Sequence, residues 1–171
     1  QPKPLKFLKR KFKDTINIED AALGSREGKS NLFISSASTL TSMSEEWINE
    51  VKNNRFKQAN WNNIIEVKVS TLDQMIAKYG KPDFCKIDVE GFELEVLKGL
   101  TQPIGTISFE FTIPEFVDKA IECVNYLNNL GNIICNYSSG ETLIFSLDKW
   151  LVPTDFIPLF KSLPDKGIID G

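Results

Sequence analysis

Two acidic residues, Asp88 and Glu90, stand two positions apart at the end of an apolar run, directly before Gly91. Because side chains alternate along a strand, both carboxylates would project to the same side if the strand continued to Glu90. A carboxylate can act as a proton acceptor when desolvation raises its pKa. We therefore expect a catalytic site at Asp88 and Glu90. The structural alternative is that Asp88 pairs with Lys86 and that Glu90 caps the next helix.

The chain contains no histidine, which excludes Ser-His-Asp and Cys-His catalysis and imidazole as a general base. Its three cysteines, Cys85, Cys123 and Cys135, form no Cys-x-x-Cys pair, and each lies in an apolar run. We expect buried, reduced thiols and a cytoplasmic location. Chemistry in this chain must then depend on carboxylates, hydroxyls, lysines or a cofactor.

The composition is that of a globular protein: 171 residues, of which 42% are apolar and 25% charged. We expect one domain over residues 1–171. The net charge of −3 argues against nucleic acid as a partner. No apolar run approaches the ~20 residues of a membrane-spanning helix, so we expect no membrane partner either.

Hydrophobic periodicity and turn residues predict an α/β fold, with a mainly parallel sheet and an antiparallel hairpin near the end of the chain. A capping box at Ser42-x-x-Glu45 predicts the start of a helix, and Thr71 is expected to begin another that ends at Gly80. The expected helices are residues 4–13, 42–51, 71–80, 92–98 and 114–130; the expected strands are 15–22, 31–35, 64–69, 84–89 and 104–113, with a hairpin of 133–137 and 142–147. Residues 148–171 are expected to be an irregular aromatic tail packed on this body.

Strand 84–89 is nearly all apolar, which is typical of a strand covered on both faces. In parallel α/β sheets, ligands bind outside the carboxyl ends of the strands. The expected strand exits are 88–91, Glu110 and 20–22, and these are the candidate positions for a site.

The segment KIDVEGFELEVLKGL, followed by ISFEF, resembles the second half of the FkbM-type S-adenosylmethionine-dependent methyltransferases. Upstream segments agree with the family in the expected order: Asp20-Ala21-Ala22-Leu23-Gly24-Ser25, then Ser38-Thr39-Leu40, then Val67-x-Val69-x-Thr71-Leu72-Asp73. The resemblance extends over roughly residues 4–147.

The resemblance implies a class I methyltransferase sheet, which is Rossmann-like with strand order 3-2-1-4-5-7-6, and S-adenosylmethionine as the cofactor. The reaction it implies is O-methylation of a small hydroxylated or sugar-like acceptor. It places Asp20, Ala21 and Asp88 at the cofactor, Glu110 and Ser38 at the acceptor, and the catalytic base at Asp88 or Glu90. No metal is implied.

The chain departs from the family pattern at its start. No Gly-x-Gly loop occurs, and the acidic residue that ends the family's strand 2 is absent. Residues 4–13 resemble the helix that follows strand 2. We therefore expect a sheet without strands 1 and 2, a natural polypeptide that continues upstream, and weak cofactor binding by this chain alone.

Two further classes of function stay open. The acid-x-acid pair Asp88-Val89-Glu90 has the spacing that metal-dependent glycosyltransferases use to bind a divalent cation. Alternatively, the missing glycine loop and the aromatic tail with Trp150, Phe156 and Phe160 suit a noncatalytic, methyltransferase-like binding module.

Overall fold

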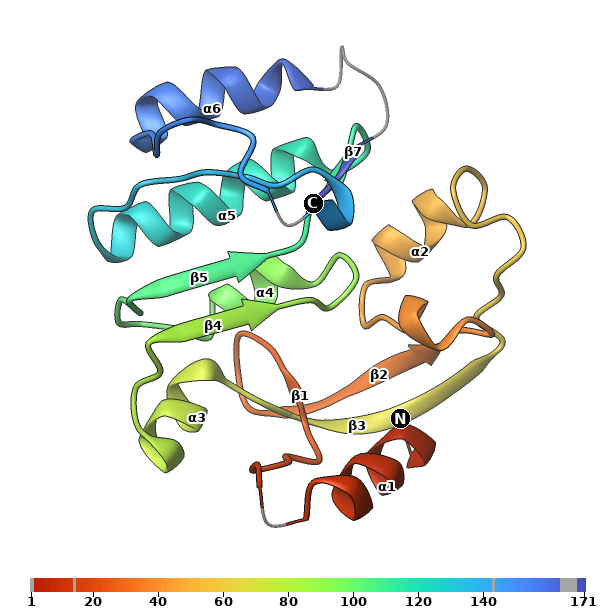
Figure 1. The fold of residues 1–171 in the computed structure, drawn as a ribbon. Coiled ribbons are helices and arrows are strands. Elements are labelled where there is room, and N and C mark those ends of the chain that lie inside the picture. Colours follow the sequence, from red (N-terminus) through yellow and green to blue (C-terminus); the bar gives the residue numbers. More distant parts are fainter. Residues whose placement is uncertain (1, 14, 143, 164–168) are drawn as a thin grey trace.

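The structure, a computed structural model, describes residues 2–13, 15–142, 144–163 and 169–171. Within these residues the chain has an α/β fold whose strands form three small sheets (Figure 1). The α/β class is confirmed. The expected mainly parallel sheet is wrong, because the strands are divided among a mixed sheet, a parallel pair and an antiparallel pair. No helix in the described part of the chain is long and apolar enough to cross a membrane.

The first sheet follows helix α1 (Pro2–Lys11) and has the order β1–β3–β2. Its strands are β1 (Ala22–Leu23), β2 (Gly28–Ile34) and β3 (Asn63–Ser70). The expected strand over residues 15–22 is wrong except at Ala22, because β1 pairs with β3 only at Ala22–Val69 and Leu23–Ser70. Before β1 the chain is irregular, and Glu19 there forms an ion pair with Lys78.

A connection between β2 and β3 contains the 3-10 helix η1 (Ser38–Leu40) and the helix α2 (Glu45–Val51). Ser44, not Ser42, is the N-cap of α2, and its hydroxyl accepts a hydrogen bond from the Trp47 amide at 3.1 Å. The inward positions of α2 are as expected, since Trp47, Ile48 and Val51 are all buried.

The central elements agree well with the sequence. They are α3 (Leu72–Tyr79), β4 (Phe84–Ile87), α4 (Glu93–Leu97) and β5 (Thr106–Phe109). Thr71 accepts a hydrogen bond from the Gln74 amide at 3.2 Å and so caps α3, and Gly80 ends that helix with a φ of +90°. β4 and β5 pair in parallel, so Asp88 and Glu110 follow directly at the carboxyl ends of neighbouring strands.

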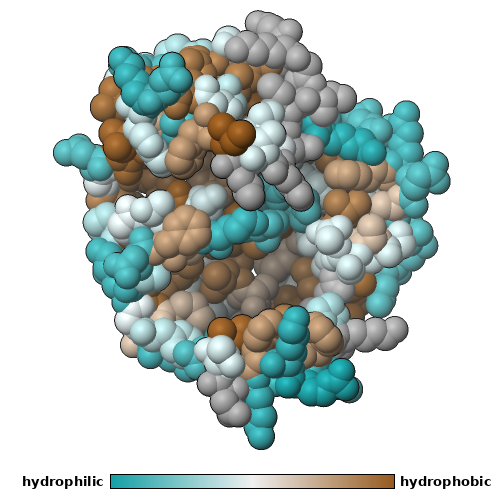
Figure 2. All heavy atoms as spheres, in the orientation of Figure 1, coloured by the Kyte–Doolittle hydropathy of each residue, from teal (hydrophilic) through white to brown (hydrophobic). Residues whose placement is uncertain are grey.

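Strand β4 is covered on one face only, which corrects the expectation of a strand buried on both. Ile87 is buried among the helices, whereas Phe84 on the other face is 58% exposed. Figure 2 shows the surface hollowed between the β4–β5 pair and the β1–β3–β2 sheet, with hydrophobic residues inside. In the described residues, β5 is the only strand that pairs with β4.

The C-terminal part packs as a separate layer around helix α5 (Val117–Leu130) (Figure 1). Its other elements are β6 (Thr112–Ile113), the 3-10 helix η2 (Gly140–Thr142), α6 (Pro153–Lys161) and β7 (Ile169–Asp170). The expected strand 104–113 is thus broken, since β5 ends at Phe109 and β6 pairs with β7 instead.

Two expectations for the C-terminal part are wrong. The hairpin is reduced to isolated bridges, Cys135–Leu151 and Ser138–Phe145, with residue 143 outside the described part. The tail contains a helix, because Pro153 suits the first helical turn. Phe156 and Phe160, one turn apart, stack with their ring centroids 5.2 Å from each other and belong to the hydrophobic core.

Candidate functional site

The candidate site begins at the turn that connects β4 to α4. The strand ends at Ile87, and Glu90 and Gly91 follow with φ angles of +53° and +82°. Glu90 is therefore not extended, so the alternation argument fails for its side chain. A left-handed conformation is rare for a residue other than glycine and persists only where the surroundings enforce it.

Two polar side chains fix this turn. The Glu93 carboxylate is buried and accepts hydrogen bonds from the backbone amides of Gly91 at 3.1 Å and Val89 at 3.3 Å. From the opposite side, the Ser42 hydroxyl donates to the carbonyl oxygen of Glu90 at 2.6 Å. Helix α4 thus uses Glu93, not Glu90, to bind the amides before it. The structural alternative is wrong for Glu90.

The Trp47 side chain packs against the backbone of Gly91. A Cβ atom at position 91 would lie 2.5 Å from both Cβ and Cδ1 of Trp47, which is too close for any residue but glycine. Trp47 is itself held by Phe56 and Trp61, whose rings lie 5.9 and 6.3 Å from it. The connection between β2 and β3 therefore shapes the turn that presents Glu90.

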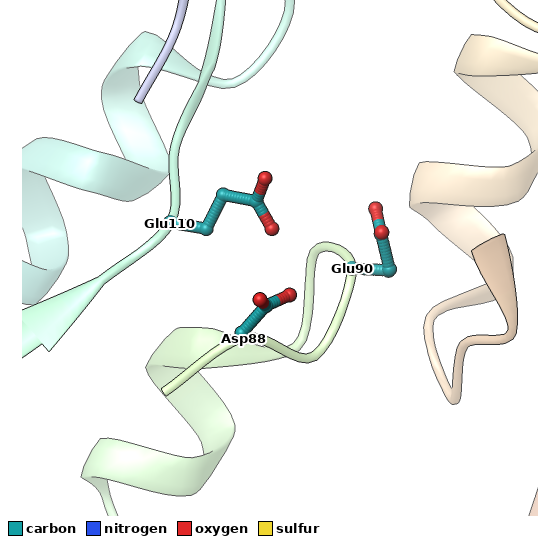
Figure 3. Close-up of side chains that lie close together, drawn as sticks. All are labelled: Asp88, Glu90 and Glu110. Carbon is teal, nitrogen blue, oxygen red and sulfur yellow. The ribbon is translucent and has the colours of Figure 1, made fainter. Parts of the chain in front are cut away.

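The three carboxylates of Asp88, Glu90 and Glu110 converge at this point (Figure 3). One oxygen from each lies within 4.8 Å of the other two. The Glu110 amide donates a hydrogen bond to the Ile87 carbonyl at 3.2 Å and so continues the β4–β5 pairing. This pairing brings Asp88 and Glu110 together. The structure thus brings together three of the residues that the sequence singled out.

The pKa values of Asp88 and Glu110 are shifted in opposite directions. Hydrogen bonding to Lys86 lowers the pKa of Asp88, with a smaller contribution from a hydrogen bond with Glu110. Burial, followed by the hydrogen bond and charge of Asp88 and then the charges of Glu90 and Glu93, raises the pKa of Glu110 to about 8. Like-charged carboxylates at this spacing favour retention of one proton, and Glu110 is the group that holds it.

Glu93 lies near the cluster, but its carboxylate is hydrogen-bonded to the backbone of the turn. Burial raises its pKa, and the amides of Gly91 and Val89 that donate to it oppose this rise. The charge of Asp88 adds to the rise. Its carboxylate is engaged with the turn, so its role is to hold the turn in shape.

A cavity of about 310 Å³ lies beside the cluster, between α2, the 90–95 turn and the start of α5. Its polar lining consists mainly of glutamates, and Lys119 is the basic residue among the described residues that line it. Lys119 is paired with Glu46 across the cavity. The lining glutamates are Glu45, Glu46, Glu90, Glu93, Glu95 and Glu110, and the aromatic residues are Trp47, Phe92, Phe111 and Phe116. Such a mixture of apolar walls and a few convergent polar groups is typical of a small-molecule site.

The other predicted site residues lie elsewhere. Asp20 and Ala21 precede β1 and so lie at its amino end, not at a strand exit, and Asp20 is exposed near Lys9 at 3.9 Å. Ser38 begins η1 and does not line the cavity. Asp88 is close to the cavity through Glu110 but does not line it either.

Sequence reasoning missed the contributions of Trp47 and Glu93 to the site. Trp47 was expected in the core, which is correct. Its contact with Gly91 joins residues far apart in the sequence, and no local pattern predicts it. Glu93 was interpreted through its position in the first helical turn. A carboxylate two residues after Gly91 could have indicated a side chain that accepts hydrogen bonds from the amides before the helix, as the glutamate of a capping box does.

The cluster could also hold a divalent cation. Hard cations bind carboxylate oxygens at about 2.0–2.6 Å, so oxygens around one ion lie a few ångströms apart. The spacing of Asp88, Glu90 and Glu110 satisfies that condition. The Lys86 ammonium pairs with Asp88, and the raised pKa of Glu110 favours its uncharged form, so both reduce the negative charge of the cluster.

The chain belongs to the FkbM methyltransferase family. The family model for the methyltransferase FkbM domain matches residues 1–134, which is most of the chain and includes the whole carboxylate cluster. The match ends at residue 134, inside the first strand of the expected hairpin. Neither the curated proteins nor the solved structures contain a match to this chain.

We expect Gly91→Ala to destabilise the fold by about 2–4 kcal/mol, because a left-handed residue becomes strained and its methyl group clashes with Trp47. Urea unfolding measures this change. Gly80→Ala is the matched control, since Gly80 has a similar positive φ but open space where the methyl group would lie. Equal losses in the two variants would contradict the importance of the Trp47 contact.

We expect Glu110→Gln to raise the thermal unfolding midpoint at pH 9 and to leave it unchanged at pH 4. A carboxylate whose pKa is raised on folding favours the folded state at low pH, and this contribution is lost as the pH rises from about 4.5 to about 8. Glutamine imitates the protonated form at every pH. Calorimetric scans across this range test the expectation, with the exposed Glu122→Gln on α5 as the control, and a midpoint difference that does not vary with pH would contradict it.

Proposed function

We propose that the protein transfers a methyl group from S-adenosylmethionine to a hydroxyl group of a small hydroxylated or sugar-like acceptor. The observation that carries this proposal is the position of Glu110, a half-buried carboxylate with a raised pKa at the wall of the cavity. Membership of the FkbM methyltransferase family supports the reaction type.

The cavity suits the reacting end of this cofactor. Its acidic lining is electrostatically favourable for a sulfonium cation, and its volume of about 310 Å³ is near the lower limit of ligand sites. When bound, the cofactor supplies an electrophilic methyl group. Glu90 and Glu110 are the residues that would face the sulfonium and the acceptor. That Asp20 and Ala21 border the adenine, within a class I sheet that lacks strands 1 and 2, stays a prediction from the resemblance.

The residues of this chain then align the acceptor and remove its proton. Glu110 is the better proton acceptor of the cluster, because a pKa of about 8 makes it a stronger base than an ordinary carboxylate. Asp88 keeps a lowered pKa through Lys86 and is a weak base, so its proposed role is to maintain the basicity of Glu110. Glu90, held at the cavity wall by the turn, remains as a residue that orients the acceptor.

Calorimetry with S-adenosylmethionine tests the proposal. We expect binding heat with the protein. Gly91→Ala should weaken binding, because the turn that presents Glu90 would be disturbed. Absence of heat at millimolar cofactor would remove the enzyme hypothesis and favour a noncatalytic binding module.

The pH dependence of methyl transfer distinguishes the carboxylates. Turnover of the unmodified protein should rise with pH to a plateau above about 8, as Glu110 loses its proton. Glu110→Gln should reduce turnover at least about 100-fold, the usual contribution of a general base. Asp88→Asn should retain turnover but shift the rising limb to lower pH, because the charge that raises the pKa of Glu110 is gone. Loss of turnover in Asp88→Asn with an unshifted profile in Glu110→Gln would assign the base to Asp88.

A metal-dependent glycosyltransferase remains the second candidate, and the spacing of the three carboxylate oxygens favours it. Activity that disappears in a chelator, returns with a divalent cation and needs no methyl donor would support this candidate and contradict methyl transfer.

A further inference from the structure

A second depression, which shares the lining residue Glu45 with the cavity, has several asparagines in its lining. It has a volume of about 640 Å³ and lies between α2 and residues 59–64. Four asparagines contribute to its lining: Asn49, Asn53, Asn60 and Asn62. All four are exposed. We call this depression the asparagine groove.

The asparagine groove is close to electrically neutral, unlike the acidic cavity. Among its lining residues, Glu45 and Lys52 are the charged ones, and they have opposite signs. Lys52 donates a hydrogen bond to the side-chain oxygen of Asn49 at 2.6 Å. A ligand that bears several charges would therefore find little compensation here, and a neutral polar ligand fits better.

The polar groups of the groove can both donate and accept hydrogen bonds. Each asparagine amide offers two N–H donors and an acceptor oxygen, which matches hydroxyl groups that also donate and accept. The side chains of Asn60 and Asn62 make no hydrogen bond to other described residues, so their amides can bind a ligand. The backbone of Asn60 is fixed by a pair of hydrogen bonds with Ser36, at 2.9 and 3.2 Å.

An aromatic and aliphatic surface accompanies these amides. Trp61 is half-buried, and its indole N–H donates to the Leu40 carbonyl at 2.7 Å, so the ring is held in place. Phe33 and the exposed Ile64 extend the apolar part of the lining. Fixed aromatic rings beside amide groups suit sugar rings, which have apolar C–H faces and hydroxyl edges.

We propose that the asparagine groove binds an uncharged oligosaccharide. This site is distinct from the carboxylate cavity, although Glu45 lines both. Its binding does not require methyl transfer, so the proposal stands or falls separately from the proposed function.

Nuclear magnetic resonance with the intact chain tests this inference. Maltohexaose, cellotetraose and mannohexaose are titrated as neutral probes, and hexagalacturonate as the charged comparison. We expect the side-chain amide signals of Asn60 and Asn62 and the indole signal of Trp61 to shift with at least one neutral probe, and to respond much less to the uronate. Absence of shifts with all three neutral probes at 20 mM, or shifts confined to cavity residues, would overturn the proposal.

A double variant, Asn60→Ala with Asn62→Ala, should weaken binding of the responding probe about tenfold or more, as expected for the loss of two or more hydrogen bonds. Its thermal unfolding midpoint should stay unchanged, because both side chains are exposed and unpaired within the described residues. The matched control is Asn128→Ala with Asn129→Ala, which are exposed at the end of α5 and line neither depression. Equal affinity of the groove variant and the control would also overturn the proposal.

Discussion

The contact between the Trp47 ring and the backbone of Gly91 constrains the whole candidate site. It leaves no room for a side chain at position 91, directly after Glu90, which has a left-handed conformation. The hydrogen bonds from Ser42 and to Glu93 act on the same turn from its two sides. Residues from α2, from the turn and from α4 are therefore interdependent, although α2 is separated from the others by about forty residues of sequence, including β3 and α3.

This rigidity has an electrostatic effect. The charges of three carboxylates within 4.8 Å of one another repel, so ionising all three is unfavourable. The ion pair with Lys86 and the raised pKa of Glu110 both reduce this repulsion. Lys86 stabilises the charge of Asp88, so the proton resides on Glu110. Two acids that are close in space but differ in environment thus have pKa values shifted in opposite directions. Such pairs are common in sites that transfer protons.

The sequence was sufficient for the elements that depend on local signals. Thr71 and Gly80 delimit α3, and the apolar run before Asp88 predicts β4, as the structure confirms. Expectations failed where distant residues decide the outcome. Residues 15–21 alternate as a strand does but pair with no strand among the described residues. Pro158 in the tail did not prevent a helix that Phe156 and Phe160 stabilise by packing. The convergence of Asp88 and Glu110 was predictable from parallel strand ends, but the path of Glu90 was not.

The exposed face of β4 has a consequence for handling the protein. A strand with one paired edge in the described residues can recruit the edge of another chain, and Phe84 adds apolar surface beside it. Lys86 lies on the same face as Phe84, and its charge disfavours such association between chains. The residue that sets the acidity of Asp88 therefore also opposes self-association, and its replacement by an uncharged side chain would lower solubility together with any change at the carboxylates.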